Sequence, residues 1–227
     1  SVHVDDTLSE GWRQSGGLLE GAIPAGRETH QVRIAYDATP QTGLHFRGGR
    51  DTLDPVMEVW SQGENEDNRY WFPSWDYPSD TFTVSQHLTV PDDWTAIGNG
   101  IQVEPESPTE DAPGMRTWHY RLDQPIVNYL VMMAAGEYRV FHDDTARVPL
   151  EFVVPATVDE ETARRTLGRT AAQFVYFEDL IGTPYPYDIY RQIIVQRFIY
   201  GGMENASATI LSDRLLVSTD DEPWRGS

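Results

Sequence analysis

The feature that most constrains the fold is a change in hydrophobic period at Pro155. Before this residue, apolar and polar side chains alternate, most clearly over residues 81–90 and 115–122. A period of two is typical of strands that keep one face in contact with solvent. We therefore expect a mostly β part over residues 1–154, built as an antiparallel β-sandwich or as a saddle of sheets.

Shorter segments and turn signals complete this β part. Further strands are predicted at 30–36, 137–141 and 150–154, and Asn99-Gly100 is typical of a turn between strands. The stretch 104–114 is rich in Pro, Glu and Asp, which predicts an exposed hairpin loop.

After this part the pattern becomes helical. Thr157 and Glu160 match a capping box, and apolar residues then recur at spacings of three and four as far as Ile181. This predicts one helix over 157–181, which Gly182 can end in a left-handed conformation. Two more strands are predicted after it, at 192–195 and 208–211.

The charge of the chain excludes two classes of partner. It has 17 Lys and Arg residues against 36 Asp and Glu residues, a net charge of −19. Nucleic-acid binding and docking on an anionic membrane both need clustered positive charge, so neither is expected. No apolar run approaches the roughly 18 residues of a membrane-spanning helix, so no membrane segment is expected in this chain.

Candidate metal ligands and nucleophiles are scarce. There is no Cys, which excludes disulfides, thiolate zinc sites and cysteine nucleophiles. The six His residues are scattered without a His-Glu-x-x-His pattern, and Gly-x-Ser-x-Gly does not occur. We therefore expect no metal site and no catalytic residue within this chain.

The most informative segment is Gly201-Gly202-Met203-Glu204-Asn205. Two glycines permit a close approach of the backbone to a ligand, or an unusual backbone conformation, and a carboxylate and an amide follow at once. On spacing alone, the segment is more typical of a turn before the strand predicted at 208–211.

Together with a second block, this segment resembles a known family. The residues from Gly201 to Asn205, with the apolar strand after them, resemble the Gly-x-Met-Glu-Asn motif of zinc aminopeptidases of the aminopeptidase N family. Gln62-Gly63-Glu64, Arg69 and residues 72–78 resemble that family's Gln-x-Glu and Arg-x-x-Phe-Pro-Cys-x-Asp-x-Pro pattern. The turn at 98–100 continues the order of the blocks, which together span most of the chain.

The resemblance implies a fold, a reaction and a set of binding residues. It implies an amino-terminal β domain over 1–154 and the start of an α+β, thermolysin-like catalytic domain over 155–227. In that family, the Glu of Gly-x-Met-Glu-Asn and the Glu of Gln-x-Glu bind the free α-amino group of a peptide. The substrate-binding residues implied for this chain are Glu64, Gly201, Gly202, Met203, Glu204 and Asn205. The implied partner is a peptide with a free amino terminus, held by charge-assisted hydrogen bonds.

The family's zinc motif is not present in these 227 residues. In the family, His-Glu-x-x-His and a downstream Glu follow the Gly-x-Met-Glu-Asn strand by a few dozen residues, and further strands precede the region matched by 1–21. The resemblance therefore implies a segment of a longer aminopeptidase. The parent would use zinc as its cofactor, whereas this chain would bind none and would be inactive alone.

Two alternatives remain beside this hypothesis. One, from another class, is a non-enzymatic β-sandwich interaction module from a relative that lacks the zinc site. The other is a zinc-containing relative that acts on an epoxide lipid. Glu64 disfavours this second alternative, because such relatives often have Gln at that position.

Overall fold

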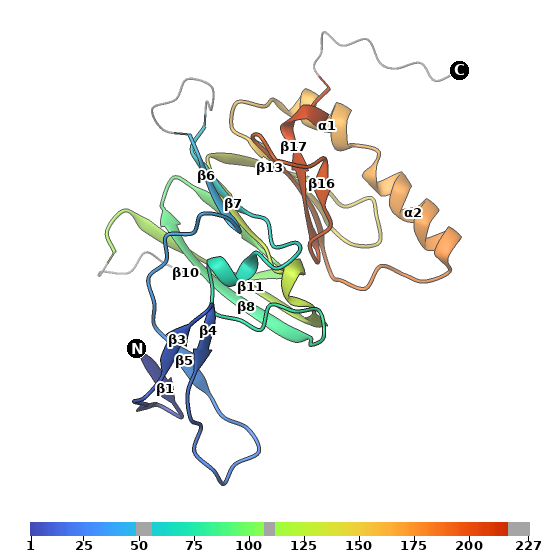
Figure 1. Ribbon diagram of the computed structural model, residues 1–227. Helices are drawn as coiled ribbons and strands as arrows, with labels where there is room; N and C mark the ends of the chain where they lie inside the picture. The colour runs from blue at the N-terminus through green and yellow to red at the C-terminus, as the bar shows by residue number, and fades with distance from the viewer. Residues whose placement is uncertain (49–55, 107–111, 218–227) are drawn as a thin grey trace. The chain divides into compact units, whose positions relative to one another are not determined.

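The computed structural model describes residues 1–48, 56–106 and 112–217, and the chain divides into two compact units, Ser1–Thr39 and Pro40–Ser227 (Figure 1). The smaller unit holds an antiparallel sheet in the order β2-β1-β5 and a separate hairpin of β3 and β4. Its strands are β1 (Val2–Val4), β2 (Thr7–Leu8), β3 (Arg13–Ser15), β4 (Leu18–Glu20) and β5 (Val32–Ile34). The strand predicted at 30–36 is β5, which is shorter than expected.

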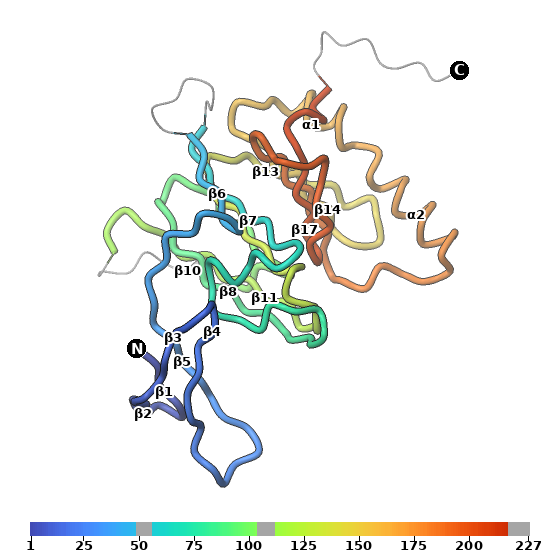
Figure 2. The backbone as a smooth tube through the Cα atoms, in the orientation of Figure 1, coloured from blue at the N-terminus to red at the C-terminus, as the bar shows by residue number. Residues whose placement is uncertain are grey.

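The larger unit begins with two antiparallel sheets, in the orders β6-β7-β12-β9 and β10-β11-β8 (Figure 2). Their strands are β6 (Leu44–Arg47), β7 (Glu58–Ser61), β8 (Phe82–Pro91), β9 (Thr95–Gly98), β10 (Ile101–Glu106), β11 (Met115–Ile126) and β12 (Met133–Gly136). The strands predicted at 81–90 and 115–122 are β8 and β11, which pair with each other. Strand β10 extends into the predicted hairpin loop, and residues 107–111 of that loop lie outside the described residues.

A mixed sheet follows in the order β13-β14-β15-β17-β16. Its strands are β13 (Tyr138–Asp143), β14 (Leu150–Pro155), β15 (Tyr190–Val195), β16 (Gly202–Met203) and β17 (Ala208–Ser212). Strands β14, β15 and β17 run parallel, and the helices α1 (Glu160–Leu167) and α2 (Thr170–Ile181) form the crossover between β14 and β15 (Figure 1). Three short 3-10 helices are η1 (Asn68–Tyr70), η2 (Asn128–Leu130) and η3 (Asp213–Leu215).

Strand β15 is apolar on both faces because it separates two cores. Ile193 and Val195 belong to a core that includes Trp60, whereas Ile194 belongs to a core that includes Leu167 of α1. Since alternate residues of a strand point to opposite sides, a strand between two cores has a continuous apolar run. The strand predicted at 192–195 is confirmed in this position.

The single helix predicted over 157–181 is wrong, because the structure has two helices. The capping box is also wrong: the side chain of Asp159 caps α1 by accepting the N–H of Thr162 at 2.7 Å. Helix α1 ends with Gly168 as its C-cap, and Thr170 lies at the break: its hydroxyl donates to the Leu167 carbonyl at 2.6 Å and lies 2.7 Å from Gln192 Oε1 in β15. This side chain bonds to the backbone at the end of α1 and ties the start of α2 to the sheet.

The end of α2 is as predicted. Gly182 has φ 72°, the left-handed conformation that an L side chain rarely adopts, and its N–H donates to the Glu178 carbonyl.

The mostly β fold class, with antiparallel sheets before the α+β part, is confirmed. Within the part of the chain that the structure describes, no helix has both the length and the apolar character needed to cross a membrane.

Candidate functional site

Strand β7 and Gln62, the residue directly after it, carry three side chains that contact the segment after β15. Glu58, Trp60 and Gln62 alternate along the chain and therefore share one face. Each contacts a different residue, in the pairs Glu58 Oε1–Gln196 N at 2.7 Å, Trp60–Phe198 with ring centroids 5.2 Å apart, and Gln62 Nε2–Met203 Sδ at 3.7 Å. The segment 196–203 therefore lies along β7.

Gln62 joins the two motif segments. Its amide donates to the Met203 sulfur and, at 3.4 Å, to the backbone carbonyl of Glu64. Its side chain is buried, and its Oε1 has no hydrogen-bond partner among the described residues. Gln62 is not among the binding residues expected from the sequence. Its place in the Gln-x-Glu motif, two residues before Glu64, is the signal that marks it.

The two predicted amine-binding carboxylates, Glu64 and Glu204, are both solvent-exposed. The backbone before Glu64 approaches Asn68 closely, because a Cβ atom on Gly63 would lie 2.6 Å from the Asn68 amide nitrogen. Asn68 is itself buried and donates to the carbonyls of Asn128 and Val131, at 2.7 Å and 3.1 Å. Glycine at position 63 thus lets the Gln-x-Glu segment rest on a fixed buried amide.

The Gly201–Asn205 segment contains a short strand as well as a turn. Met203 and Gly202 form β16, which pairs with β17, and the Ser212 N–H donates to the Gly201 carbonyl at 3.1 Å. Neither glycine has a positive φ, so an unusual backbone conformation is not their reason. A Cβ atom on Gly202 would lie 2.9 Å from Leu211 Cδ2, whereas the space beside Gly201 is open.

Asn205, the last residue of the motif, is buried. Its Nδ2 donates to the Met203 carbonyl at 3.4 Å, and its Oδ1 has no hydrogen-bond partner among the described residues. Gln62 and Asn205 therefore each contribute one buried amide oxygen without a hydrogen-bond partner among the described residues.

The turn at 98–100 holds the residues that follow the motif. Asn99 donates to the carbonyl of Ala206 at 2.8 Å, and the Gly100 N–H donates to the hydroxyl of Ser207 at 2.6 Å. Arg191 of β15 donates to the Gly100 carbonyl at 2.5 Å and pairs with Glu151. The turn at 98–100 therefore bonds to residues 206 and 207, which follow the motif segment that Gln62 contacts.

The Arg-x-x-Phe-Pro block has a structural role. Arg69 donates twice to the buried Asp76 carboxylate, from its backbone N–H at 2.8 Å and from its Nε at 3.3 Å. Its guanidinium lies 5.0 Å from the centroid of the Tyr77 ring. These contacts close the loop that follows Glu64.

Glu58 of β7 is a buried carboxylate beside residues 196–203. Its second oxygen accepts the Tyr138 hydroxyl at 2.9 Å, while the first accepts the Gln196 N–H. Burial raises the pKa of Glu58 to about 7, although both hydrogen bonds lower it. Burial and the neighbouring carboxylate also raise the pKa of Tyr138 well above its usual value.

Metal ligands do not converge in the part of the chain that the structure describes. No group of three His, Asp or Glu side chains there could hold a metal ion. The described residues do not fit a zinc site, so no reaction step is assigned to a metal held by them.

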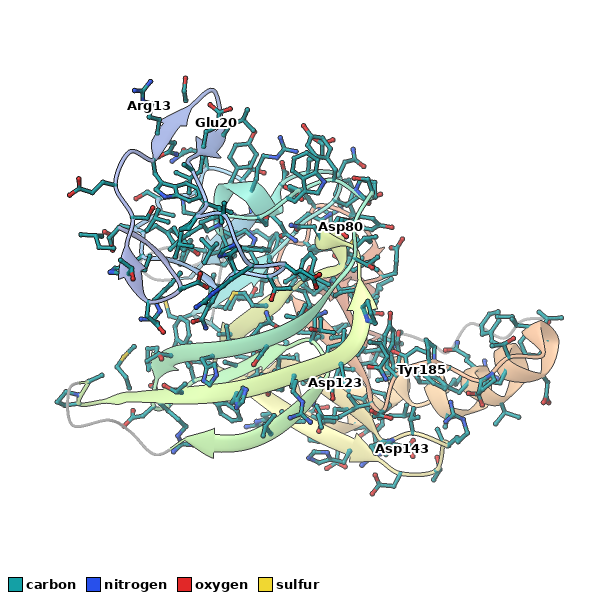
Figure 3. All side chains as sticks on the ribbon, turned by 90° about the horizontal axis from the view of Figure 1, so that it is seen from below. Arg13, Glu20, Asp80, Asp123, Asp143 and Tyr185 are labelled. Carbon is teal, nitrogen blue, oxygen red and sulfur yellow. The ribbon has the colours of Figure 1, made fainter. Side chains whose placement is uncertain are left out.

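A cavity of about 430 Å³ lies between α2 and the chain that leads into β15. Phe174, Phe177 and Ile181 of α2 line it together with Tyr185, which Figure 3 shows beside the helix. Its lining includes none of the predicted binding residues.

Two family models match the chain. The Peptidase M1 N-terminal domain matches residues 22–130, and the Peptidase family M1 domain matches residues 165–223. The matches lie on either side of the domain boundary expected at 154, and that boundary stays a prediction.

Curated relatives are of two kinds. Aminopeptidase N of Streptomyces lividans is 28% identical over 211 residues, which are 91% of this chain and 24% of that protein. Transcription initiation factor TFIID subunit 2 of Danio rerio is 27% identical over 186 residues, 79% of this chain and 15% of that protein. The chain thus spans a quarter or less of the length of these relatives.

A solved structure has the same fold. It is a mutant of a two-domain M1 zinc metallopeptidase bound to L-arginine, with a TM-score of 0.73 and 20% identity, matched over 95% of this chain and 51% of that one. The likeness to this structure shows the fold alone, whereas the two family models and the curated relatives are matches in sequence. On this evidence the chain belongs to peptidase family M1.

Proposed function

We propose that this chain supplies the amine-recognition part of a zinc-dependent M1 aminopeptidase, which removes amino-terminal residues from peptides. Glu64 and Glu204 bind the α-ammonium group of the substrate. The observation that carries the proposal is the contact of the Gln62 amide with both Met203 and the Glu64 carbonyl. Through these contacts, the side chain of Gln62 lies next to Met203, the residue before Glu204, and next to the backbone of Glu64.

The chemistry of these groups suits an ammonium ion. Two exposed carboxylates can accept charge-assisted hydrogen bonds, and the buried amide oxygens of Gln62 and Asn205 lack partners among the described residues. An internal peptide segment brings no cation, so it forms no charge-assisted hydrogen bond with either carboxylate. Selection for a free amino terminus follows from that difference.

The proposal divides the work between this chain and the whole protein. Residues 1–154 would be the β domain and residues 155–227 the start of the catalytic domain, with Gly201, Gly202 and Met203 lining the peptide backbone. Hydrolysis and the zinc ion are assigned to the whole protein. The 227-residue chain by itself is proposed to bind no zinc and to cleave no peptide.

Replacing Glu204 tests the amine-binding role. In the full-length protein, Glu204→Gln should lower kcat/KM for peptides with a free amino terminus about ten- to a hundred-fold, because one charge-assisted hydrogen bond contributes about 1.5–3 kcal/mol. Amino-acetylated peptides should lose far less. Glu161→Gln, at an exposed glutamate of α1, is the matched control and should change neither value. An unchanged preference for the free amine in Glu204→Gln would refute the assignment.

A second candidate function is a non-enzymatic interaction module. The observation that favours it is the likeness to Transcription initiation factor TFIID subunit 2, over 79% of this chain. Zinc analysis and peptide turnover by the full-length protein separate the two. Stoichiometric zinc with turnover supports the enzyme, and a well-folded full-length protein with neither supports the module.

A further inference from the structure

Glu58 fixes the start of the segment that carries the proposed amine site. The backbone N–H of Gln196, just before Gly201 in the chain, donates to Glu58 Oε1 at 2.7 Å. The Gln196 side chain is held as well, because its Nε2 donates to the Val56 carbonyl at 3.1 Å. Between these anchors and Met203, the space beside Gly201 is open. The placement of Gly201 therefore depends on the contacts at Gln196 and Met203, on the packing of Phe198 against Trp60, and on the hydrogen bond from the Ser212 N–H to the Gly201 carbonyl.

The Glu58 carboxylate makes these contacts without a cation. It is 1% exposed, its second oxygen accepts the Tyr138 hydroxyl at 2.9 Å, and no ion pair between described residues includes it. A buried carboxylate held only by neutral donors is sensitive to its own charge, because burial costs the ionised form much more free energy than the neutral form.

The other titratable and charged groups around Glu58 come from the elements packed against β7. They are His45 and Arg47 on β6, Glu137 just before β13 and Tyr138 at its start, Arg197 after β15, and Asp213 at the start of η3. Arg47 lies opposite Glu58 in the sheet register, and its guanidinium lies 5.7 Å from the centroid of the Trp60 ring. Burial is the main cause of the raised pKa of Glu58, and the charge of Asp213 adds to it.

We propose that Glu58 is a positioning residue for the amine site, and that protonation of its carboxylate changes how firmly residues 196–203 are held against β7. This inference rests on the proposed function for its consequence in the enzyme. An ionised carboxylate accepts hydrogen bonds roughly twice as strong as a neutral acceptor does. While Glu58 stays buried, its contact with the Gln196 N–H is therefore stronger when Glu58 is ionised, although burying the ionised carboxylate costs the folded chain free energy overall. With a pKa of about 7 for Glu58, the change falls near neutral pH.

Amide NMR of the 227-residue chain tests the link without any substrate. The amide proton of Gln196 should move downfield as the pH rises, with a midpoint near 7, and the amide of Met203 should follow with the same midpoint. In Glu58→Gln, whose side chain has the same shape and no charge, both titrations should vanish. A Gln196 amide that does not titrate, or that titrates equally in the variant, overturns the proposal.

Tyr138→Phe is the second variant, since it leaves the Gln196 contact in place. It removes a hydrogen bond that lowers the pKa of Glu58, so the midpoint at Gln196 should move to higher pH. A midpoint that stays in place, or that moves to lower pH, means that another group titrates, which contradicts the assignment to Glu58.

The consequence for catalysis is measured in the full-length protein. The KM for a free-amine peptide in Glu58→Gln, relative to wild type, should be about one at low pH and rise about five-fold above pH 8, while the kcat ratio stays constant. Taking the ratio cancels the titration of the peptide itself. A KM ratio that is flat with pH overturns the positioning role. Failure of the proposed function looks different, because it is seen in Glu204→Gln and leaves the Gln196 titration intact.

Discussion

Strand β15 and helix α2 are neighbours in the sequence and both are rich in apolar residues, but their apolar side chains are covered very differently. Ile193 and Ile194 of β15 are 0% exposed, whereas Leu180 and Ile181 of α2 are 65% and 68% exposed. The two cores that cover β15 include residues of β7, β9, β11, β12, β13, β14, β17 and α1. An apolar period thus predicts an element without telling which residues cover it. Within the described residues, the apolar side chains in the last turns of α2 remain exposed.

Matched phenylalanines give the largest expected difference between the two regions. Phe198, after β15, is 0% exposed and packs on Trp60, whereas Phe177 of α2 is 52% exposed. Phe198→Ala should lower the free energy of unfolding by about 3–5 kcal/mol because it leaves a cavity. Phe177→Ala should lower it by less than about 1 kcal/mol. Urea unfolding of both variants measures this, and equal losses would show that α2 is as well covered as β15.

Matched glutamates should respond to pH with opposite sign. Burial raises the pKa of Glu58 to about 7, so the stabilisation it provides is complete at low pH and is lost as the pH rises through 7. Relative to Glu58→Gln, wild type should therefore lose up to about 3 kcal/mol between pH 5 and pH 8.

In α2, a hydrogen bond from Arg147 lowers the pKa of Glu178, so its contribution is lost only as the pH falls below the usual range of a glutamate. Unfolding curves of wild type and Glu178→Gln over the same pH series provide the comparison. Differences of the same sign for Glu58 and Glu178 would contradict this account.

Matched glycines give the smallest effect. Gly182 ends α2 with φ 72°, so Gly182→Ala should destabilise the chain by about 1 kcal/mol through strain in the left-handed region. Gly201 has no positive φ, and a methyl group added to it would touch no described residue, so Gly201→Ala should be neutral or stabilise by about 0.5 kcal/mol. The midpoints of urea unfolding, compared at constant m value, measure the stability changes of both variants. A larger loss in Gly201→Ala would reveal packing beside the motif.

Elements with a strong local period can be predicted from the sequence. Strands β8 and β11 alternate over many residues, and β15 and β17 are short apolar runs, so each is expected close to its observed bounds. Strand β7 escapes prediction because its sequence, Glu58-Val59-Trp60-Ser61, has polar residues at both ends that are nevertheless buried. Their partners lie far away in the chain, so no local pattern marks them.

The same limit applies to the helices and to the site. Helix α1 ends with Gly168 as its C-cap, and the contact of Thr170 with Gln192 that ties the start of α2 to β15 is revealed by no local spacing. The residues of the site are expected from family motifs rather than from periodicity, and their roles stay predictions. The role of Gln62 as the link between the motifs needs the folded chain, since its partner Met203 is 141 residues away.

The contacts of β7 with residues 196–203 also constrain the order of folding. Glu58 meets Gln196 across 138 residues of chain, and Gln62 meets Met203 across 141. Contacts between such distant residues are opposed by loop-closure entropy until the intervening elements have formed. During synthesis, β7 leaves the ribosome long before its partner exists. The antiparallel pair of β8 and β11 can form in that interval, and β16 takes its place only after β15 has been made.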